Sequence, residues 1–293
     1  MTVDRKWEAP PSEFLVPYDG TFRIATAPTA PSGEADKVAL KATRRERTEE
    51  IYELQRRLYA DNRYAVLFVF QAMDAGGKDG TIRDVFTGVN PAGFQVSSFK
   101  APSEEELDHD FLWRIARRLP ERGRIGVFNR SHYEEVLVVR VHPEFVESQR
   151  LPNLNRETIW NERFESIRNF EEHLADNGTI IVKFFLNVSR EQQKHRLLRR
   201  IDKPSRNWKF SLRDVKERER WPEYMHAFEE ALNETSRPWA PWYAIPADNK
   251  PYMRLQVARI VQETLESLGV DFPALDETAR LALAECRKVL ERQ

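Results

Sequence analysis

Runs of apolar residues alternate along this chain with longer segments in which apolar residues recur every three or four positions. The runs are typical of buried strands, and the longer segments are typical of amphipathic helices. We predict strands at 65–71, 94–99, 124–128, 179–188 and 242–246. We predict helices at 37–61, 81–88, 103–118, 155–175, 189–202, 213–234 and 252–268. This alternation favours an α/β fold, in which a parallel sheet lies between two layers of helices.

The composition changes near both ends of the chain. Residues 1–36 are rich in Pro, Ser, Thr and Ala, which is typical of an extended arm that lies over the surface. We expect one domain over 37–270, with a basic lid at about 190–213, and a helical tail over 271–293. In parallel sheets ligands bind at the carboxyl ends of the strands, so the turns after the strands are where we expect a site.

The turn after the strand at 65–71 contains three glycines and a lysine. The glycines would let backbone N–H groups approach phosphate oxygens, and Lys78 would reach the phosphate being transferred. The start of the following helix adds N–H donors. This context indicates a phosphate loop, although an ordinary glycine turn in a sheet has a similar sequence. The predicted phosphate-binding residues are Gly76, Gly77, Lys78, Asp79, Gly80, Thr81, Asn129 and Ser131.

The loop departs from the usual P-loop pattern at two positions. Ala72 stands where that pattern has Gly, and Asp79 stands where it has Ser or Thr. A second carboxylate, Asp74, lies within the loop. Hard oxygen ligands of this kind suit Mg²⁺, with Mn²⁺ as the alternative cation.

A second polar turn follows the strand at 124–128. Arg130 would bind a phosphate through two hydrogen bonds, which a lysine cannot do, and Glu134 is an acid close to it. The alternative is an exposed polar turn in which Tyr133 packs and His132 is solvated. Phosphoryl transfer depends mostly on positioning and charge neutralisation, so His132 is left out of the predicted catalytic set.

The segment 190–213 is strongly basic. It contains nine Lys or Arg and two acids, a local charge of +7 in a chain of net charge −1. Arg196 and the bases three, four and seven positions later share one helix face, before Pro204 ends the helix. Unrelieved charge of one sign is costly unless an anion joins it. A polyanion bound beneath a lid is favoured over nucleic acid stacked on Trp208 and Phe210.

The overall composition excludes several classes of protein. The nearly balanced charge lacks the basic bias of a general nucleic-acid binder, so we expect no nucleic acid. The single cysteine, Cys286, excludes an intramolecular disulfide framework and a Cys-rich zinc site. We find no signal peptide, and the apolar run at 65–70 is far too short for a bilayer. We expect a soluble, cytoplasmic protein with no membrane partner.

Three motifs in this order resemble the polyphosphate kinase 2 family. They lie at 71–80, 128–134 and 203–211, and the similarity runs from about residue 40 to 270. The resemblance implies a P-loop kinase fold with a helical lid. It also implies transfer of a phosphoryl group from inorganic polyphosphate to a nucleotide, with Mg²⁺. The Asn129-to-Glu134 form of the second motif resembles the subgroup that accepts both AMP and ADP (class III). Family members are often homo-oligomers, which we expect here too.

The resemblance also assigns residues. By position it implies Asp74, Lys78, Arg130 and Glu134 as the catalytic residues, with Asp74 and Glu134 holding the metal. The lid residues that resemble polyphosphate contacts are Arg196, Arg199, Arg200, Lys203, Arg206 and Lys209. Two alternatives stay open: an ATP-dependent nucleoside monophosphate kinase, and a catalytically inactive polyanion- or RNA-binding protein.

Overall fold

The computed structural model of the chain describes residues 7–33 and 36–293. This part of the chain contains a five-stranded parallel sheet with the order β2-β3-β1-β4-β5. The strands are β1 Ala65–Gln71, β2 Phe94–Ser98, β3 Ile125–Asn129, β4 Thr179–Asn187 and β5 Trp242–Pro246. All five predicted strands are confirmed, with ends that differ by one residue at most.

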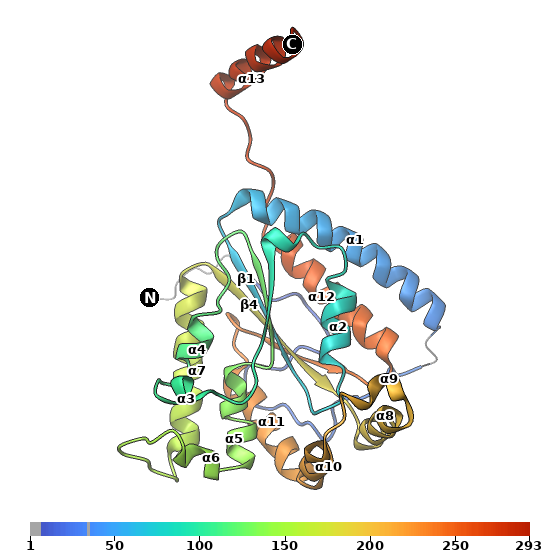
Figure 1. Ribbon diagram of the computed structural model, residues 1–293, viewed down its shortest axis with the longest axis vertical. Helices are drawn as coiled ribbons and strands as arrows, with labels where there is room; N and C mark the ends of the chain where they lie inside the picture. The colour runs from blue at the N-terminus through green and yellow to red at the C-terminus, as the bar shows by residue number, and fades with distance from the viewer. Residues whose placement is uncertain (1–6, 34–35) are drawn as a thin grey trace.

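Helices cover both faces of the sheet, so the predicted three-layer α/β fold is confirmed (Figure 1). Helices α1 (Lys37–Asp61), α2 (Lys78–Val85) and α12 (Lys250–Ser267) pack together on one face. Helices α7 (Ile159–Asp176) and α11 (Trp221–Thr235) pack on the other. Every residue of β1 is buried, as expected for a central strand with helices on both sides.

Short helices make up most of the remaining connections. They are η1 Pro91–Gly93, α3 Glu104–Leu107, α4 Trp113–Ala116, η2 His132–Glu135, α5 Val138–Val141, α6 Glu144–Glu147 and α9 Pro204–Asn207. Longer helices are α8 Arg190–Asp202, α10 Leu212–Glu219 and α13 Glu277–Leu290. The segment predicted as the lid, 190–213, therefore contains α8, α9 and the start of α10, between β4 and β5.

Four predicted helices are wrong in extent. The helix at 81–88 lies three residues earlier, at Lys78–Val85, where Gly77 opens it. The helix at 103–118 is broken: it begins with the predicted capping box at Ser103, but Asp110 caps a new turn by accepting from the Leu112 N–H. The helix at 213–234 is divided at Arg220, because Pro222 has no N–H to continue the hydrogen bonds. The helix at 155–175 begins at Ile159.

The described part of the N-terminal arm lies along the body. Phe14 and Val16 are buried, and the Val16 N–H donates to the Trp242 carbonyl oxygen at 2.9 Å. Residues 1–6 and 34–35 lie outside the description. At the other end α13 projects from the body and has no buried residue (Figure 1). Among the described helices, none is long and apolar enough to cross a membrane.

Candidate active site

The loop after β1 turns sharply enough to require its glycines. Ala75 and Gly77 have positive φ values of 60° and 114°. A Cβ on Gly76 would lie 2.5 Å from the Ala72 Cβ and 2.8 Å from the Met73 carbonyl oxygen, so no larger residue fits there. The loop thus folds back tightly on the residues that follow β1 and leads directly into the first turn of α2, whose N–H groups can bind an anion.

Lys78 is the first residue of α2 and is buried. Its Nζ donates to the Ala72 carbonyl oxygen at 2.7 Å, which holds the side chain across the loop. Burial, and then the nearby charge of Arg130, lower the pKa of Lys78 to about 8. Asp74 and Glu134 oppose this shift through their negative charge. The predicted phosphate-binding lysine therefore lies among the predicted catalytic residues.

Arg130 links the two predicted metal-binding carboxylates. Its Nη2 donates to Asp74 Oδ1 at 2.8 Å, and its Nη1 donates to Glu134 Oε2 at 3.3 Å. The charge of Glu134 raises the pKa of Arg130 further. Arg130 has a positive φ of 65°, an unusual conformation for a residue with a side chain. The structure therefore brings Asp74, Arg130 and Glu134 together from two strand ends.

Asp79 connects the loop to β3 and to the lid. Its Oδ1 accepts from Asn129 Nδ2 at 2.9 Å, and its Oδ2 lies 3.3 Å from Lys209 Nζ. Burial alone would raise the pKa of Asp79, but these two hydrogen bonds lower it, and the pKa stays below its ordinary value. Asn129 at the end of β3 and Lys209 of the predicted lid therefore both contact the first turn of α2 through Asp79, and contact of these residues with phosphate stays a prediction.

Two predicted phosphate-binding hydroxyls already have protein partners. Thr81 Oγ1 donates to the Gly77 carbonyl oxygen at 3.0 Å, and Ser131 Oγ accepts from the Tyr133 N–H at 3.2 Å. Both residues are buried. They stabilise the loop and the second turn, and their contact with phosphate stays a prediction. Gly80 lies beside Arg254 rather than at the centre of the loop.

Arg196 differs from the other lid residues. It is buried, and its guanidinium donates to four backbone carbonyl oxygens, those of Ala75, Gly76, Ala247 and Asp248. Burial lowers its pKa to about 10. On the same helix, Gln193 Nε2 donates to the Asp74 carbonyl oxygen at 3.0 Å. Helix α8 thus binds the backbone of the phosphate loop through Arg196 and Gln193.

The remaining predicted lid bases are more accessible. Arg200 forms an ion pair with Asp214 at 3.0 Å. Arg199, Lys203 and Arg206 are exposed, and no ion pair is found for them among the described residues. They are the part of the lid that is available to a polyanion, and this role stays a prediction.

The sequence did not single out Lys250, which begins α12 after β5. It is partly buried, and burial followed by the charges of four arginines lowers its pKa to about 8. Those arginines are Arg196, Arg254, Arg199 and Arg206. No ion pair is found for Lys250 within the described residues. Its position after the last strand could have marked it as a candidate site residue, because ligands bind at the carboxyl ends of the strands.

A cavity of about 460 Å³ opens beside Asp74, Arg130 and Glu134. One wall is apolar and includes Leu107, Phe111, Ile115, Val138 and Phe145. Leu107, Phe111 and Ile115 fall in the segment predicted as one helix at 103–118. Val138 and Phe145 lie in α5 and α6, which the sequence did not predict. The volume and lining suit a planar, partly apolar group held next to the predicted phosphate-binding residues.

The carboxylates fit a hard divalent cation. Asp74 and Glu134 lie on either side of Arg130, and both line the cavity. Mg²⁺ takes one or two protein carboxylates and completes its octahedron with water and substrate phosphates. The described residues contain no cluster of three or more metal-binding side chains, which such a substrate-bridged cation does not need.

The model of the family named Polyphosphate kinase 2 (PPK2) matches residues 34–273 of this chain. An ADP-polyphosphate phosphotransferase of Rhodopseudomonas palustris is 54% identical over 248 residues, which are 84% of this chain and 86% of that protein. An AMP/ADP-polyphosphate phosphotransferase of Meiothermus ruber is 49% identical over 221 residues, 75% of this chain and 79% of that protein.

A solved structure is also similar. The crystal structure of polyphosphate kinase 2 from Arthrobacter aurescens TC1 superposes with a TM-score of 0.82 at 37% identity. The match covers 90% of this chain and 93% of that one. The similarity therefore spans the sheet, the loop and the lid together.

Proposed function

Because this chain belongs to the polyphosphate kinase 2 family, we propose that it phosphorylates AMP to ADP and ADP to ATP, with Mg²⁺. Its reaction is polyphosphate-dependent nucleotide phosphorylation. The observation that carries the proposal is the contact of Arg130 with both Asp74 and Glu134. These groups lie beside the phosphate loop on one side and the cavity on the other.

The cavity takes the nucleoside of the acceptor. Its apolar wall would cover the base, and Arg130 would pair with the acceptor phosphate at the cavity's inner end. Asp74 and Glu134 hold the Arg130 guanidinium in place before the substrate arrives. The side chain of Arg130 therefore loses little conformational freedom when the substrate binds.

The loop and the lid take the donor. The N–H groups at the start of α2 and Lys78 would hold the terminal phosphates of the chain. Arg199, Lys203, Arg206 and Lys250 would neutralise the phosphates further along it. Within the 190–213 segment, Arg200 and Lys209 already pair with Asp214 and Asp79. The exposed bases Arg199, Lys203 and Arg206 remain for the donor, and an ATP-dependent kinase would not need this basic surface.

The transfer is a direct in-line displacement. An oxygen of the acceptor phosphate forms a bond to the terminal phosphorus as the bond to the bridging oxygen breaks, so the polyphosphate leaves one unit shorter. Lys78 and Arg130 would stabilise the charge on the transferred group. Mg²⁺, when held by Asp74 and Glu134, would supply further neutralisation of the phosphate oxygens.

The acceptor range is the finer part of the proposal. The form of the second motif, Asn129 to Glu134, and the name of the Meiothermus ruber relative support both AMP and ADP. The name of the Rhodopseudomonas palustris relative mentions ADP alone. We also propose that the enzyme is a cytoplasmic homo-oligomer that does not act on nucleic acid.

The test is to mix the protein with AMP, MgCl₂ and inorganic polyphosphate, without ATP, and to resolve the nucleotides by chromatography. We expect ADP first and ATP afterwards. Product from ADP but none from AMP would restrict the acceptor to diphosphates. No product with polyphosphate, together with ADP formed from AMP when ATP is supplied, would show an ATP-dependent kinase instead.

A further inference from the structure

A charged pair is buried in the core, between the sheet and helices α7 and α11. Lys183 on β4 and Glu171 on α7 are 0% and 1% exposed. Lys183 Nζ lies 2.5 Å from Glu171 Oε2 and also donates to the Tyr133 hydroxyl at 2.8 Å and the Thr235 carbonyl oxygen at 2.9 Å. All three hydrogen-bonding positions of the ammonium group are therefore used.

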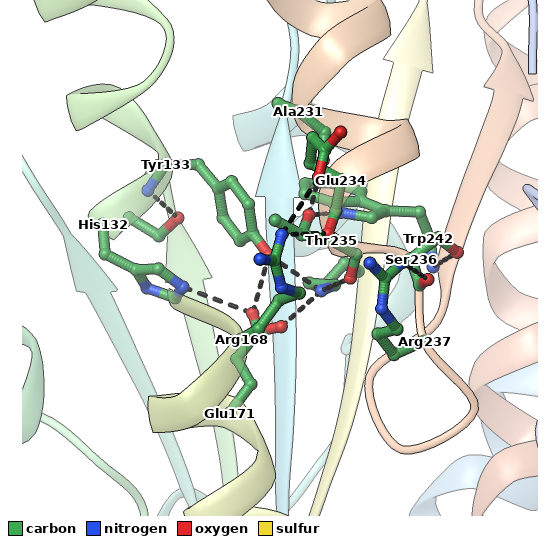
Figure 2. Close-up of polar contacts among 12 residues, drawn as sticks. His132, Tyr133, Arg168, Glu171, Ala231, Glu234, Thr235, Ser236, Arg237 and Trp242 are labelled. Carbon is green, nitrogen blue, oxygen red and sulfur yellow. Dashed lines mark hydrogen bonds and ion pairs between the residues drawn. The ribbon is translucent and has the colours of Figure 1, made fainter. Parts of the chain in front are cut away.

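Glu171 binds two consecutive residues of the second turn (Figure 2). Its Oε1 accepts from the Tyr133 hydroxyl at 2.8 Å and lies 3.3 Å from His132 Nε2. His132 is buried, so the alternative of an exposed turn with a solvated histidine is wrong, although Tyr133 is packed as that alternative had it. One carboxylate from α7 thus fixes η2 at the two residues that precede Glu134.

The stability of the fold does not explain this arrangement. A buried ion pair is often no more stabilising than well-packed apolar residues of the same size, because both charges lose their water. Hydrogen bonds differ from apolar contacts in that they fix direction as well as distance. A cluster of this kind specifies where η2 lies.

The turn before η2 needs such an anchor. Arg130 has a φ of 65°, and a strained conformation persists only when its surroundings determine it more strongly. The strand β3 holds the turn on one side. His132 and Tyr133, bound to Glu171, hold it on the other.

We propose that Lys183 and Glu171 are positioning residues for phosphoryl transfer. By fixing His132 and Tyr133, they hold Arg130 and Glu134 toward Asp74 and the reacting phosphates. This inference rests on the roles proposed above for Arg130 and Glu134. It predicts that the pair affects turnover without touching either substrate.

The main test replaces both charges at once with Lys183→Met and Glu171→Leu, because a single replacement would leave the other charge buried and unpaired. We expect a folded protein whose kcat falls on the order of 10–100-fold, as small misplacements of catalytic groups do. We expect the KM for long-chain polyphosphate to change less than about twofold, because the lid is untouched. Tyr133→Phe, which removes only the shared hydroxyl, should lower kcat in the same direction by a smaller factor.

Two controls separate positioning from packing. Phe185→Leu alters a buried residue two positions along β4, on the same face, and should lower the melting temperature while kcat stays unchanged. Arg130→Lys combined with the Lys183/Glu171 replacement should lower kcat by less than the product of the two separate factors. Both changes act on the same contact, that of Arg130 with Asp74 and Glu134.

Wild-type kcat in the folded double variant would overturn the inference, and so would fully independent effects of Arg130→Lys. If the double variant does not fold, Tyr133→Phe decides: a wild-type kcat in that variant also overturns it. Failure of the proposed function would be seen separately, because the unaltered protein would then form no product from polyphosphate in the same assay.

Discussion

Arg196 Nη1 donates a hydrogen bond to the carbonyl oxygen of Gly76 at 2.7 Å, in the middle of the phosphate loop. The same guanidinium reaches the Asp248 carbonyl oxygen at 3.2 Å, at the turn between β5 and α12. One side chain of α8 therefore ties together two turns at the carboxyl edge of the sheet. We therefore expect Arg196 to fix the backbone conformation of the phosphate loop.

We predict that Arg196→Lys lowers kcat about tenfold or more, because a lysine cannot make all of these hydrogen bonds and the loop loses its shape. The melting temperature should fall, since buried carbonyl oxygens lose their donors. The KM for polyphosphate should stay within about twofold. Arg199→Lys, an exposed neighbour on the same helix, serves as the control. An unchanged kcat with a raised KM for polyphosphate would instead identify Arg196 as a contact to the chain.

The sequence allowed the sheet and the phosphate loop to be predicted because both depend on local signals. Apolar runs mark the strands, and glycines next to Lys78 mark the turn. The spacing of Arg196, Arg199 and Arg200 correctly places them on one helix. It does not show that this helix turns Arg196 toward the loop and leaves Arg199 in solvent, because that depends on tertiary packing.

The contacts that the sequence missed join residues far apart in the chain. Lys183 lies within an apolar strand, and nothing near it indicates that Glu171 and Tyr133 will meet it in the core. The part of the cavity wall that contains Val138 and Phe145 is built from α5 and α6, helices of four residues that are too short to show a periodicity. Such features follow from the assembled fold rather than from any one segment.

We predict that Asp74→Asn and Glu134→Gln each raise the Mg²⁺ concentration needed for half-maximal activity by on the order of tenfold. Each replacement removes one anionic oxygen ligand while it keeps the size of the side chain. Part of the lost activity should return at high Mg²⁺. Asp61→Asn, at an acid paired with Arg63 on the surface, should leave the Mg²⁺ titration unchanged. Titrations that coincide with the wild type for both site variants would rule out these two ligands.

Lys78 should make the fold less stable than it would be with an apolar residue. Burial lowers its pKa from 10.5 to about 8, so the folded protein binds this proton more weakly than the unfolded chain. Below pH 8 the full cost is present, about 3 kcal/mol at 1.36 kcal/mol per pKa unit. Between pH 8 and 10.5 the unfolded chain binds more protons at Lys78 than the folded protein does. The free energy of unfolding therefore rises with pH in this range, and the cost of Lys78 becomes smaller.

We therefore predict that Lys78→Met raises the free energy of unfolding at pH 7 by about 2 kcal/mol, after about 1 kcal/mol is lost with the hydrogen bond to Ala72. The gain should shrink toward pH 10. Turnover should fall on the order of 100–1000-fold, as it does when one charge-stabilising donor is removed. Denaturant unfolding at both pH values measures the first effect. Lys288→Met, on the exposed helix α13, should change neither quantity. A destabilised Lys78→Met variant at pH 7 would contradict the argument.

The basic surface around Lys250 should act on the length of the polyphosphate. Lys250 lies among Arg199, Arg206 and Arg254, and none of these four residues takes part in the contact between Arg130 and Asp74. A phosphate bound there belongs to the part of the donor that does not react. Only a chain long enough to extend from the loop past α8 and α12 would reach it.

We predict that Lys250→Gln raises the KM for long-chain polyphosphate about threefold to fivefold and leaves the KM for tripolyphosphate nearly unchanged. One partly exposed cation against a phosphate contributes about 0.7–1 kcal/mol, which corresponds to this factor. The difference between wild type and variant should narrow at high salt, because screening weakens the contact that the variant lacks. Lys288→Gln removes the same charge from α13 and should match the wild type with both donors. Equal increases in KM for the short and the long donor would place Lys250 at the reacting end of the chain instead.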